Sequence, residues 1–518
     1  MRKLLAAAFA LCALVMVGPA TAQTPPNALI VGQIAEPKSL DPQAVTATND
    51  FRILVNLYDG LVRFKKGTLE VEPDLAKSWD ISDDGTTYTF HLREGVKFQD
   101  GTPFNAEAVK FTFDRMLDKT NPYYDTGPFP LAFFFSQVDT VTAKDDNTVV
   151  FKLKEPFAPF LSNLAYPTGL IVSPAAVKQY GKDFGRHPVG TGAFKFAEWD
   201  PNTKVVVTRN PDYWGGPPQL EAVVFRPITD ANTRVAEMLS GGIDLMVEVP
   251  PDSLSQFKQN SSFKVYEAAG PHLWFLILNT KEGPFSDKRV RQAVNYAIDK
   301  KALVDNVLQG TATIAAGPIP RAFAWANDGS VKPYPYDPEK AKELIRAAGA
   351  EGKTLTFYVA EGGSGMLDPV AMATAIQADL KKVGLNARIQ TYEWNTYLAN
   401  VNPGLKGKAD MAEMAWMTND PDTLPFLALR TDAAPDKGGF NSGYYSNPDV
   451  DKLLDEARRV TDRNKRGELY EKVQKIVHDD APWAFIANWK QNAVSTAAVK
   501  GFELEPSFLL NLKDVTKE

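Results

Sequence analysis

Short apolar runs, turn residues and amphipathic stretches follow one another along the chain from about residue 27 onward. Residues 78–81 and 88–92 each alternate apolar and polar positions, and Gly85 lies in the turn between them, which predicts a β-hairpin. Residues 109–117 then carry apolar side chains at the spacing of one helix face, and Asn105 is placed to cap that helix. The alternation of both patterns predicts a mixed α/β chain.

The second half of the chain repeats this alternation with longer apolar runs. Residues 273–278 form a run typical of a buried strand, and apolar residues at helical spacing follow within 290–298. Between residues 355 and 391 the pattern is strand, helix and strand, and the helix is expected to end before Gly384. We therefore expect a β-α-β unit there, inside a compact unit that begins near residue 273. The apolar helical stripes are interpreted as core rather than as partner surface.

The N-terminal stretch differs from the rest of the chain. Basic residues at positions 2 and 3 precede an apolar run over 4–17, and small residues at 20 and 22 complete the pattern of a secretory signal cleaved before Gln23. This run is shorter than the ~20 residues that span hydrocarbon, and no later run approaches that length. We therefore expect residues 1–22 to be a signal peptide and the mature protein to be soluble and exported.

Cysteine chemistry is restricted to this leader. The only cysteine, Cys12, lies within it, and Leu11 is larger than the residue that a bacterial lipoprotein signal places before its cysteine. A lipid anchor is therefore disfavoured. The mature chain is left without disulfides, thiolate zinc sites or a cysteine nucleophile.

Length, composition and charge narrow the possible functions. The 518 residues suggest about three structural units at roughly 150 residues each. With 44% hydrophobic and 23% charged residues the chain is an ordinary globular mixture rather than a disordered one. Lys and Arg number 57 against 63 Asp and Glu, for a net charge of −6. No basic stripe is visible, so we expect no nucleic-acid partner.

No catalytic or cofactor motif emerges from the remaining residues. The four histidines do not lie at metal-ligand spacing, and Met366 stands where a serine-hydrolase elbow beginning at Gly362 would need its last glycine. Gly190 and Gly192 lack the third glycine of a dinucleotide fingerprint and the lysine of a phosphate loop. We therefore expect no enzyme activity, no metal and no cofactor, and binding is favoured over catalysis.

Several longer motifs resemble one known family. The first is the ten-residue stretch LREGVKFQDG at 92–101. It is followed in order by matching segments at 188–194, 209–214, 242–244, 279–280 and 289–293. Together they resemble the family 5 extracellular solute-binding proteins of ABC importers over essentially the whole mature chain. Within that family the chain is most similar to periplasmic dipeptide- and oligopeptide-binding proteins.

This resemblance implies an α/β, two-lobed periplasmic-binding-protein fold of the large type II class with an extra inserted domain. The lobes would close on a solute by a hinge motion, and the closed monomer would dock on the membrane permease of the importer. The expected divisions are 1–22 for the signal peptide, 23–63, 185–270 and 485–518 for lobe 1, 64–184 for the extra domain, and 271–484 for lobe 2.

The resemblance also implies an acidic residue in lobe 2 that pairs with the α-amino group of a peptide. The matching segment runs from Trp416 to Asp422, about two residues shorter than the dipeptide pattern, so Asn419 or Asp420 would take this place. We prefer Asp420 because only a carboxylate can neutralise an ammonium, although an Asp before Pro421 equally suits a turn. On this interpretation, Asp420→Asn weakens a free-amine ligand by more than ~1 kcal/mol and leaves the fold intact.

Other positions are assigned to the pocket in the same way. Some dipeptide binders use an arginine for the ligand carboxylate, but residues 361–366 contain none, so Ser364 and Met366 are placed in the pocket instead. The remaining ligand-lining candidates are Thr46, Thr48 and Asn49, together with Trp274 and Trp416, for both of which a core position stays open.

The main hypothesis is therefore a periplasmic peptide-binding component of an ABC importer. Relatives that carry nickel chelates, haem, glutathione, opines or oligosaccharides leave a non-peptide solute as the alternative, favoured by the missing arginine. An exported hydrolase and a chaperone for unfolded chains are the two further possibilities.

Overall fold

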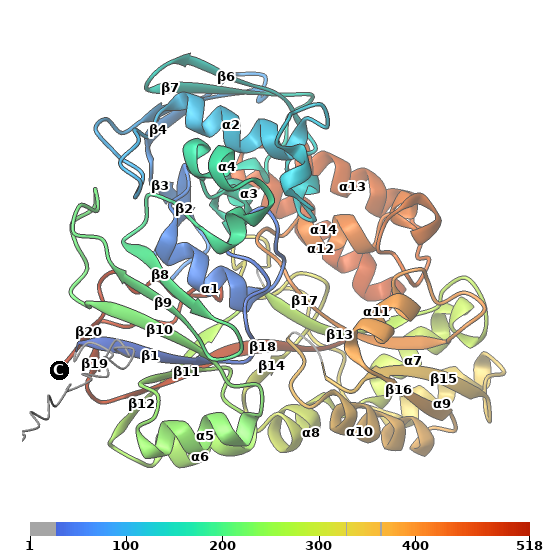
Figure 1. Cartoon of the computed structure of the whole chain (residues 1–518). Coiled ribbons are helices and arrows are strands. Elements are labelled where there is room, and N and C mark those ends of the chain that lie inside the picture. Colours follow the sequence, from blue (N-terminus) through green and yellow to red (C-terminus); the bar gives the residue numbers. More distant parts are fainter. Residues whose placement is uncertain (1–26, 328, 363–364) are drawn as a thin grey trace, which may run out of the picture.

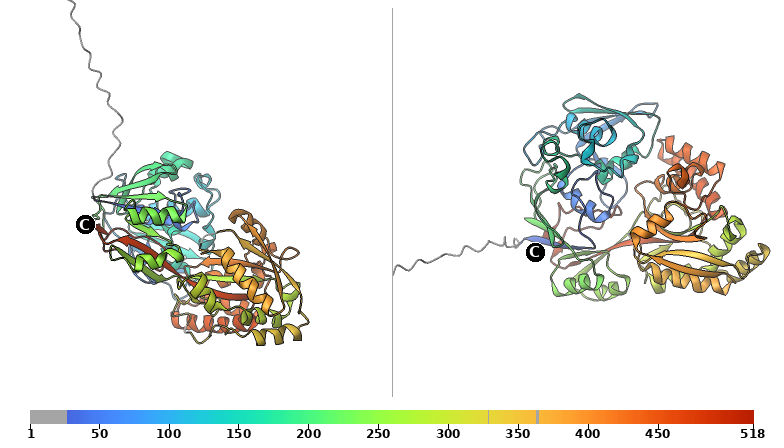
Figure 2. Two further views of the ribbon diagram at one scale, coloured as in Figure 1. Left: turned by 90° about the horizontal axis from the view of Figure 1, so that it is seen from below. Right: turned by 45° about the vertical axis from the view of Figure 1, so that its right-hand side comes forward.

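The computed structural model describes residues 27–327, 329–362 and 365–518, so the expected signal peptide and Ser364 lie outside the described residues. The chain forms two lobes and an extra domain, and this confirms the expected fold class (Figure 1). The two lobes lie next to each other, and the extra domain stands above lobe 1 and against the helices of lobe 2 (Figures 1 and 2). Among the described residues, no helix combines the length and apolar character that a membrane crossing would need.

A single strand, β18 (Trp483–Thr496), runs through both lobes. Its first half pairs with β13 (His272–Leu278) and β14 (Ala312–Ile314) of lobe 2, and its second half pairs with β11 (Leu245–Val247) and β12 (Phe263–Ala269) of lobe 1. The lobes therefore share one continuous sheet path, and the expected division at 485 falls inside this strand.

Lobe 1 is built around β1, which pairs in parallel with β10 and β11. All but one of its six residues are buried, because helices cover both faces of this part of the sheet. The C-terminal segment returns to the same lobe and contributes to its apolar core. The elements of lobe 1 are β1 (Ala28–Gln33), α1 (Thr48–Leu57), β8 (Phe194–Asp200), β9 (Lys204–Arg209), β10 (Ala222–Pro227), α5 (Ala231–Ser240), α6 (Pro251–Lys258), β19 (Val499–Lys500) and β20 (Thr516–Lys517).

Lobe 2 contains the expected β-α-β unit. Strands β15 and β16 pair in parallel, and helix α10 connects them along the chain. The helix begins after its cap Asp368 and ends just before Gly384. Strand β13 is buried at every one of its seven residues, as its apolar run predicts. The remaining elements are α7 (Lys288–Ala297), α8 (Lys300–Ala302), α9 (Pro338–Ala347), β15 (Thr354–Ala360), α10 (Pro369–Lys382), β16 (Asn386–Tyr392), α11 (Trp394–Val401), β17 (Met411–Met417), α12 (Thr423–Ala428), α13 (Pro448–Arg459) and α14 (Arg463–Asp480).

The extra domain is a four-stranded antiparallel sheet covered by helix α2. The expected hairpin is its β4–β5 pair, in which Trp79 stands opposite Phe90, and Asn105 caps α2 by accepting a bond from the Ala108 backbone. Aromatic rings fill the core between sheet and helix. Its elements are β2 (Val62–Phe64), β3 (Val71–Pro73), β4 (Ala76–Ile81), β5 (Thr87–Leu92), α2 (Ala106–Leu117), β6 (Val138–Asp145), β7 (Thr148–Leu153), α3 (Phe160–Ala165) and α4 (Pro174–Tyr180).

Short helical turns connect these elements. The expected divisions at 63/64 and 184/185 fall inside β2 and inside one of these turns, η4. The turns are η1 (Tyr124–Thr126), η2 (Ala132–Phe135), η3 (Pro167–Gly169), η4 (Gly181–Arg186), η5 (Pro284–Ser286), η6 (Leu303–Val307), η7 (Thr431–Ala433) and η8 (Pro435–Lys437).

The extra domain and lobe 2 touch along a contact that we call the seam, formed between residues 155–163 and 419–459. The Ala158 backbone N–H donates to the Arg458 carbonyl at 2.7 Å, and the Glu155 carboxylate lies 2.8 Å from the Arg459 guanidinium. The Asn419 amide donates to the side chain of Asn163 at 2.8 Å. These contacts hold the extra domain against lobe 2 on one side of the space between the lobes.

Candidate functional site

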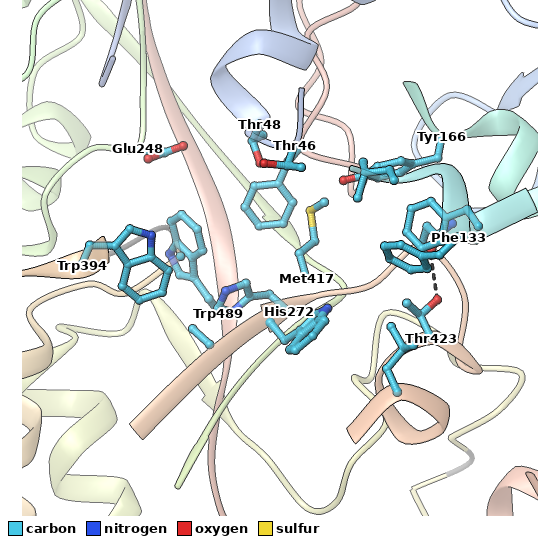
Figure 3. Close-up of a pocket in the computed structure, with 18 residues that line it drawn as sticks. Thr46, Thr48, Phe133, Tyr166, Glu248, His272, Trp394, Met417, Thr423 and Trp489 are labelled. Atoms are coloured by element: carbon cyan, nitrogen blue, oxygen red, sulfur yellow. Dashed lines mark hydrogen bonds between the residues drawn. The ribbon is translucent and has the colours of Figure 1, made fainter. Parts of the chain in front are cut away.

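A cavity of about 240 Å³ lies where the two lobes and the extra domain meet (Figure 3). Lobe 1 supplies residues at the start of α1 and after β11, the extra domain supplies residues in and beside η2 together with Tyr166, and lobe 2 supplies the start of β13 and the end of β17. Its described lining consists of Thr46, Thr48, Leu131, Phe133, Phe134, Tyr166, Glu248, His272, Gly365, Trp394, Ala415, Trp416, Met417, Asn419, Thr423, Leu427, Trp489 and Phe508.

Aromatic side chains dominate this lining. Phe133 and Tyr166 of the extra domain stand on one side of the cavity, and Trp394 and Trp489 stand on the other (Figure 3). Aromatic walls of this kind bind apolar or aromatic groups and also stabilise a cation placed over a ring face. The cavity therefore suits an organic solute with a substantial apolar part.

Among the described lining residues, charge is confined to one group. Glu248 is the single acidic side chain among the described lining residues, and none of them is a lysine or an arginine. The Glu248 side chain is 17% exposed, and its Oε1 lies 2.7 Å from Nη2 of the buried Arg52 on α1. The Nε of Arg52 also donates to the carbonyl of Phe508 at 3.2 Å. One guanidinium thus contacts both the acidic group and the backbone of Phe508, another lining residue.

Two buried nitrogen atoms at the base of the cavity have no partner among the described residues. These are Nδ1 of His272 and Nε1 of Trp489, whose rings pack edge to face with centroids 5.5 Å apart. Burial lowers the pKa of His272 to about 3, so the ring is neutral at neutral pH. Buried polar atoms normally find a hydrogen-bond partner, and these two nitrogens belong to residues that line the cavity.

Gly365 allows the chain to approach this histidine closely. It has a φ of +76°, and a side chain at this position would place its Cβ only 2.1 Å from Nε2 of His272. Of the described residues in the glycine-rich loop, Gly365 lines the cavity, whereas its neighbour Met366 packs in the core of lobe 2.

The residues expected from the sequence divide into two groups. Thr46, Thr48, Trp416 and Asn419 all line the cavity. Asn49, Trp274 and Met366 do not, because the Asn49 amide donates to the Glu36 carbonyl, Trp274 lies in the lobe 2 core, and Met366 packs as described above.

Asp420 is placed differently from the expectation and is absent from the described lining. Its carboxylate is clamped by Arg466, whose Nη1 donates to Oδ2 at 3.0 Å and whose Nη2 donates to Oδ1. Ser162 donates to Oδ2 at 3.2 Å. The Asp422 backbone donates to Oδ1 at 2.9 Å, a local bond that fits the turn role left open above. Burial by itself lowers the pKa of Arg466. The charge of Asp420 has the larger opposite effect, so the pKa of Arg466 lies above its ordinary value. Both carboxylate oxygens are therefore occupied within the protein, so an amine bound at Asp420, as expected from the sequence, would have to displace one of these partners.

Sequence reasoning missed several lining residues. Glu248 follows the buried strand β11 directly, and a charged residue that ends a buried strand was a usable signal. The aromatic run at 133–134 was another. The roles of His272 and Trp489 depend on which strands pair, and the sequence alone gave no sign of that pairing.

Comparisons with known proteins agree with this architecture. The family model described as bacterial extracellular solute-binding proteins, family 5 Middle, matches residues 70–438. The dipeptide-binding protein of Escherichia coli K12 is 35% identical over 91% of this chain and 91% of its own length. Heme-binding protein A of Haemophilus influenzae is 35% identical over 87% and 85%. An ABC transporter-associated periplasmic binding protein from Helicobacter pylori in complex with the peptide STSA superposes with a TM-score of 0.81 at 34% identity, covering 95% of this chain and 98% of that one.

Proposed function

The chain belongs to family 5 of the bacterial extracellular solute-binding proteins, and on this premise we propose that it is the peptide-capturing component of an ABC importer. It would act in the periplasm after removal of residues 1–22. There it would close its lobes around a peptide and deliver that peptide to the permease subunits. The family consists of transporter binding proteins rather than enzymes, and the relatives that bind dipeptides or the peptide STSA support this substrate class.

The observation that carries the proposal is the composition of the cavity wall. Lobe 1, lobe 2 and the extra domain all contribute side chains to one space. A solute that touches all three gains its full set of contacts only when the lobes are closed. Such a solute shifts the protein towards the closed form in proportion to its tighter binding there.

The polar groups of the cavity suit a peptide backbone. The unpaired Nε1 of Trp489 is a hydrogen-bond donor, and Nδ1 of His272 can donate in one tautomer. Peptide carbonyls are acceptors that both could use, while the aromatic walls would accommodate apolar side chains.

A non-peptide solute is the alternative, and the charge pattern supports it. No described lining residue is cationic, so a free C-terminal carboxylate would find no ionic partner there. Independently of this charge pattern, a heme-binding relative at the same identity as the dipeptide-binding one supports a non-peptide solute. The pattern favours a cargo that is cationic or uncharged inside the cavity over one that is anionic.

Thermal unfolding of the mature protein against a ligand panel tests the proposal. The panel contains free di- and tripeptides, their N-acetylated and C-amidated forms, oligosaccharides, opines and nickel chelates. A ligand at 100 times its Kd adds ~2.7 kcal/mol to the unfolding free energy, which is easily detected. Stabilisation by peptides supports the proposal, whereas stabilisation by a non-peptide alone replaces the substrate class.

A further inference from the structure

Glu248 combines a position in the cavity lining with a carboxylate that the protein does not saturate, unlike Asp420, whose two oxygens are both bonded. Arg52 contacts Oε1, and no described residue donates a hydrogen bond to Oε2. The residue lines the cavity and keeps 17% of its side chain exposed. In Figure 3 its carboxylate lies on the same side of the view as Trp394 and Trp489. A carboxylate in this position can accept a bond from a second cation.

The backbone at this position is held in an uncommon conformation. Glu248 has a φ of +55°, in the left-handed region that non-glycine residues rarely adopt. Its N–H donates to the Asn492 carbonyl at 3.2 Å, and the Asn492 side chain holds the next residue, Val249, on both its N–H and its carbonyl. Arg234 donates to the Glu248 carbonyl at 3.4 Å. A positive φ that the surrounding residues hold in place in this way is typical of positions with a functional role.

Arg52 sets the direction of the side chain. It is 2% exposed, and it contacts Glu248 while also donating to the carbonyl of Phe508, another cavity residue with positive φ, at +66°. Its Nη1 has no partner among the described residues. The arginine therefore links the acidic group to the backbone of Phe508 without occupying both carboxylate oxygens.

Resting on the proposed function, we infer that Glu248 receives the positively charged group of the ligand, and that Arg52 is the positioning residue that aims it. The charged end of the ligand would then be bound by lobe 1, in a cavity whose tryptophan rings can stabilise a cation further. The substrate class is narrowed to solutes with an amine or another cationic group beside an apolar part.

Isothermal titration of the mature protein at pH 7 with two matched probes tests this inference. The probes are phenylalanyl-leucinamide, which carries a free amine, and its N-acetyl derivative, which is uncharged. We expect the wild-type protein to prefer the free amine at least tenfold. Glu248→Gln should reduce that ratio to about one, because it weakens binding of the free amine far more than binding of the acetylated probe.

Three variants serve as controls. Glu267→Gln removes a lobe 1 carboxylate that pairs with Lys258 outside the cavity, and it should keep the tenfold preference. Glu248→Asp keeps the charge on a shorter side chain and should keep part of the preference. Arg52→Lys keeps the positive charge but loses the geometry, and it should lower the preference more than it lowers affinity for the acetylated probe.

The outcomes separate this inference from the proposed function. If peptides bind and Glu248→Gln keeps the tenfold preference, the inference is overturned and the function stands. If neither dipeptide binds, ligand-detected NMR with 2-phenylethylamine and its N-acetyl form replaces the titration. Amine binding that Glu248→Gln abolishes would then support the inference while the peptide function falls. A wild-type protein that does not distinguish the amine from its acetylated form would overturn the inference.

Discussion

Each lobe holds an arginine–carboxylate pair beside the cavity, and the two pairs have different structures. In lobe 2, Arg466 engages both oxygens of Asp420, and the two side chains are 6% and 2% exposed. In lobe 1, Arg52 contacts one oxygen of Glu248, and the rest of that carboxylate faces the cavity. The same two chemical groups thus form a closed structural pair in one lobe and an open pair in the other. An acidic residue in the expected segment is therefore no sufficient sign of an amine site, because its role depends on whether the protein already saturates it.

The largest loss of stability is expected when the closed pair in lobe 2 is disrupted. Asp420→Asn leaves the buried Arg466 without its counter-charge, which typically costs about 3–5 kcal/mol. We expect a loss of that size in the unfolding free energy of the ligand-free protein, with the preference for free-amine ligands unchanged. This reverses the expectation from the sequence, in which the same substitution weakened the amine and spared the fold.

The double variant Asp420→Asn with Arg466→Gln is the control for this experiment. It removes the unpaired charge as well and should recover part of the lost stability. A stable Asp420→Asn protein with weakened amine binding would restore Asp420 as the anchor.

Acid is expected to destabilise the folded protein through His272 on the lobe 2 wall of the cavity. Burial lowers its pKa to about 3, whereas an unfolded histidine titrates near 6.5. The unfolded state therefore takes up a proton first, and stability is lost as the pH falls from about 6.5 towards 3. Between pH 7 and pH 4 this amounts to roughly 3 kcal/mol at 1.36 kcal/mol per pH unit. The measurement is the difference in unfolding free energy between wild type and His272→Phe at both pH values.

Taking this difference separates the effect of His272 from that of buried carboxyl groups such as Asp50 and Glu505, whose effect on the pH dependence of stability has the opposite sign. Burial raises the pKa values of Asp50 and Glu505 to about 7, so each contributes a cost that appears as the pH rises from about 4 to 7. Wild type and His272→Phe both contain these carboxyl groups, so their contribution cancels in the difference between the two unfolding free energies. A wild-type minus variant difference that does not change with pH would contradict a neutral, buried His272.

Opening the lobe 1 pair should cost less than opening the lobe 2 pair. Glu248→Gln keeps an amide oxygen for Arg52, and the side chain is already partly exposed, so we expect a loss of only about 1–2 kcal/mol in ligand-free stability. Chemical denaturation of the mature protein measures this value beside that of Asp420→Asn. Equal losses in the two variants would mean that Glu248 is as structural as Asp420.

The smallest effect is expected at the seam, where the ion pair is exposed on both sides. Arg459→Ala removes the partner of Glu155, and the two side chains are 56% and 39% exposed. Exposed pairs of this kind contribute less than about 1 kcal/mol and weaken as salt increases. Wild type and variant should therefore unfold alike in 0.5 M salt. A larger loss that persists in high salt would show that the seam is held by more than this pair.

Local patterns account for the part of the fold that the sequence predicted. The hairpin of β4 and β5, helix α2 with its Asn105 cap, and the β15–α10–β16 unit all follow from side-chain period and turn residues within a few positions. Strand β18 could not be predicted as a shared strand, because its partners lie more than 170 residues earlier in the chain.

The site was predictable only where the family resemblance reached. Thr46, Thr48, Trp416 and Asn419 were placed in the cavity from matching segments alone. The role of Asp420 was not predictable, because its partner Arg466 lies 46 positions later and carries no sequence mark of the pairing. Glu248 stayed unnoticed because its importance comes from the cavity it faces and not from its neighbours in the chain.

The shared strand has a consequence for how this protein could be recombined. The chain enters lobe 2 after Ala269 and leaves it through β18, where Ala269 and Lys490 pair directly. Lobe 2 is thus formed by one continuous segment of the chain whose two ends lie next to each other. Such an arrangement tolerates insertion and exchange. Cutting at these two neighbouring points would swap the entire lobe between relatives. Such an exchange would replace the cavity residues that lobe 2 contributes, while those of lobe 1 and the extra domain stay the same.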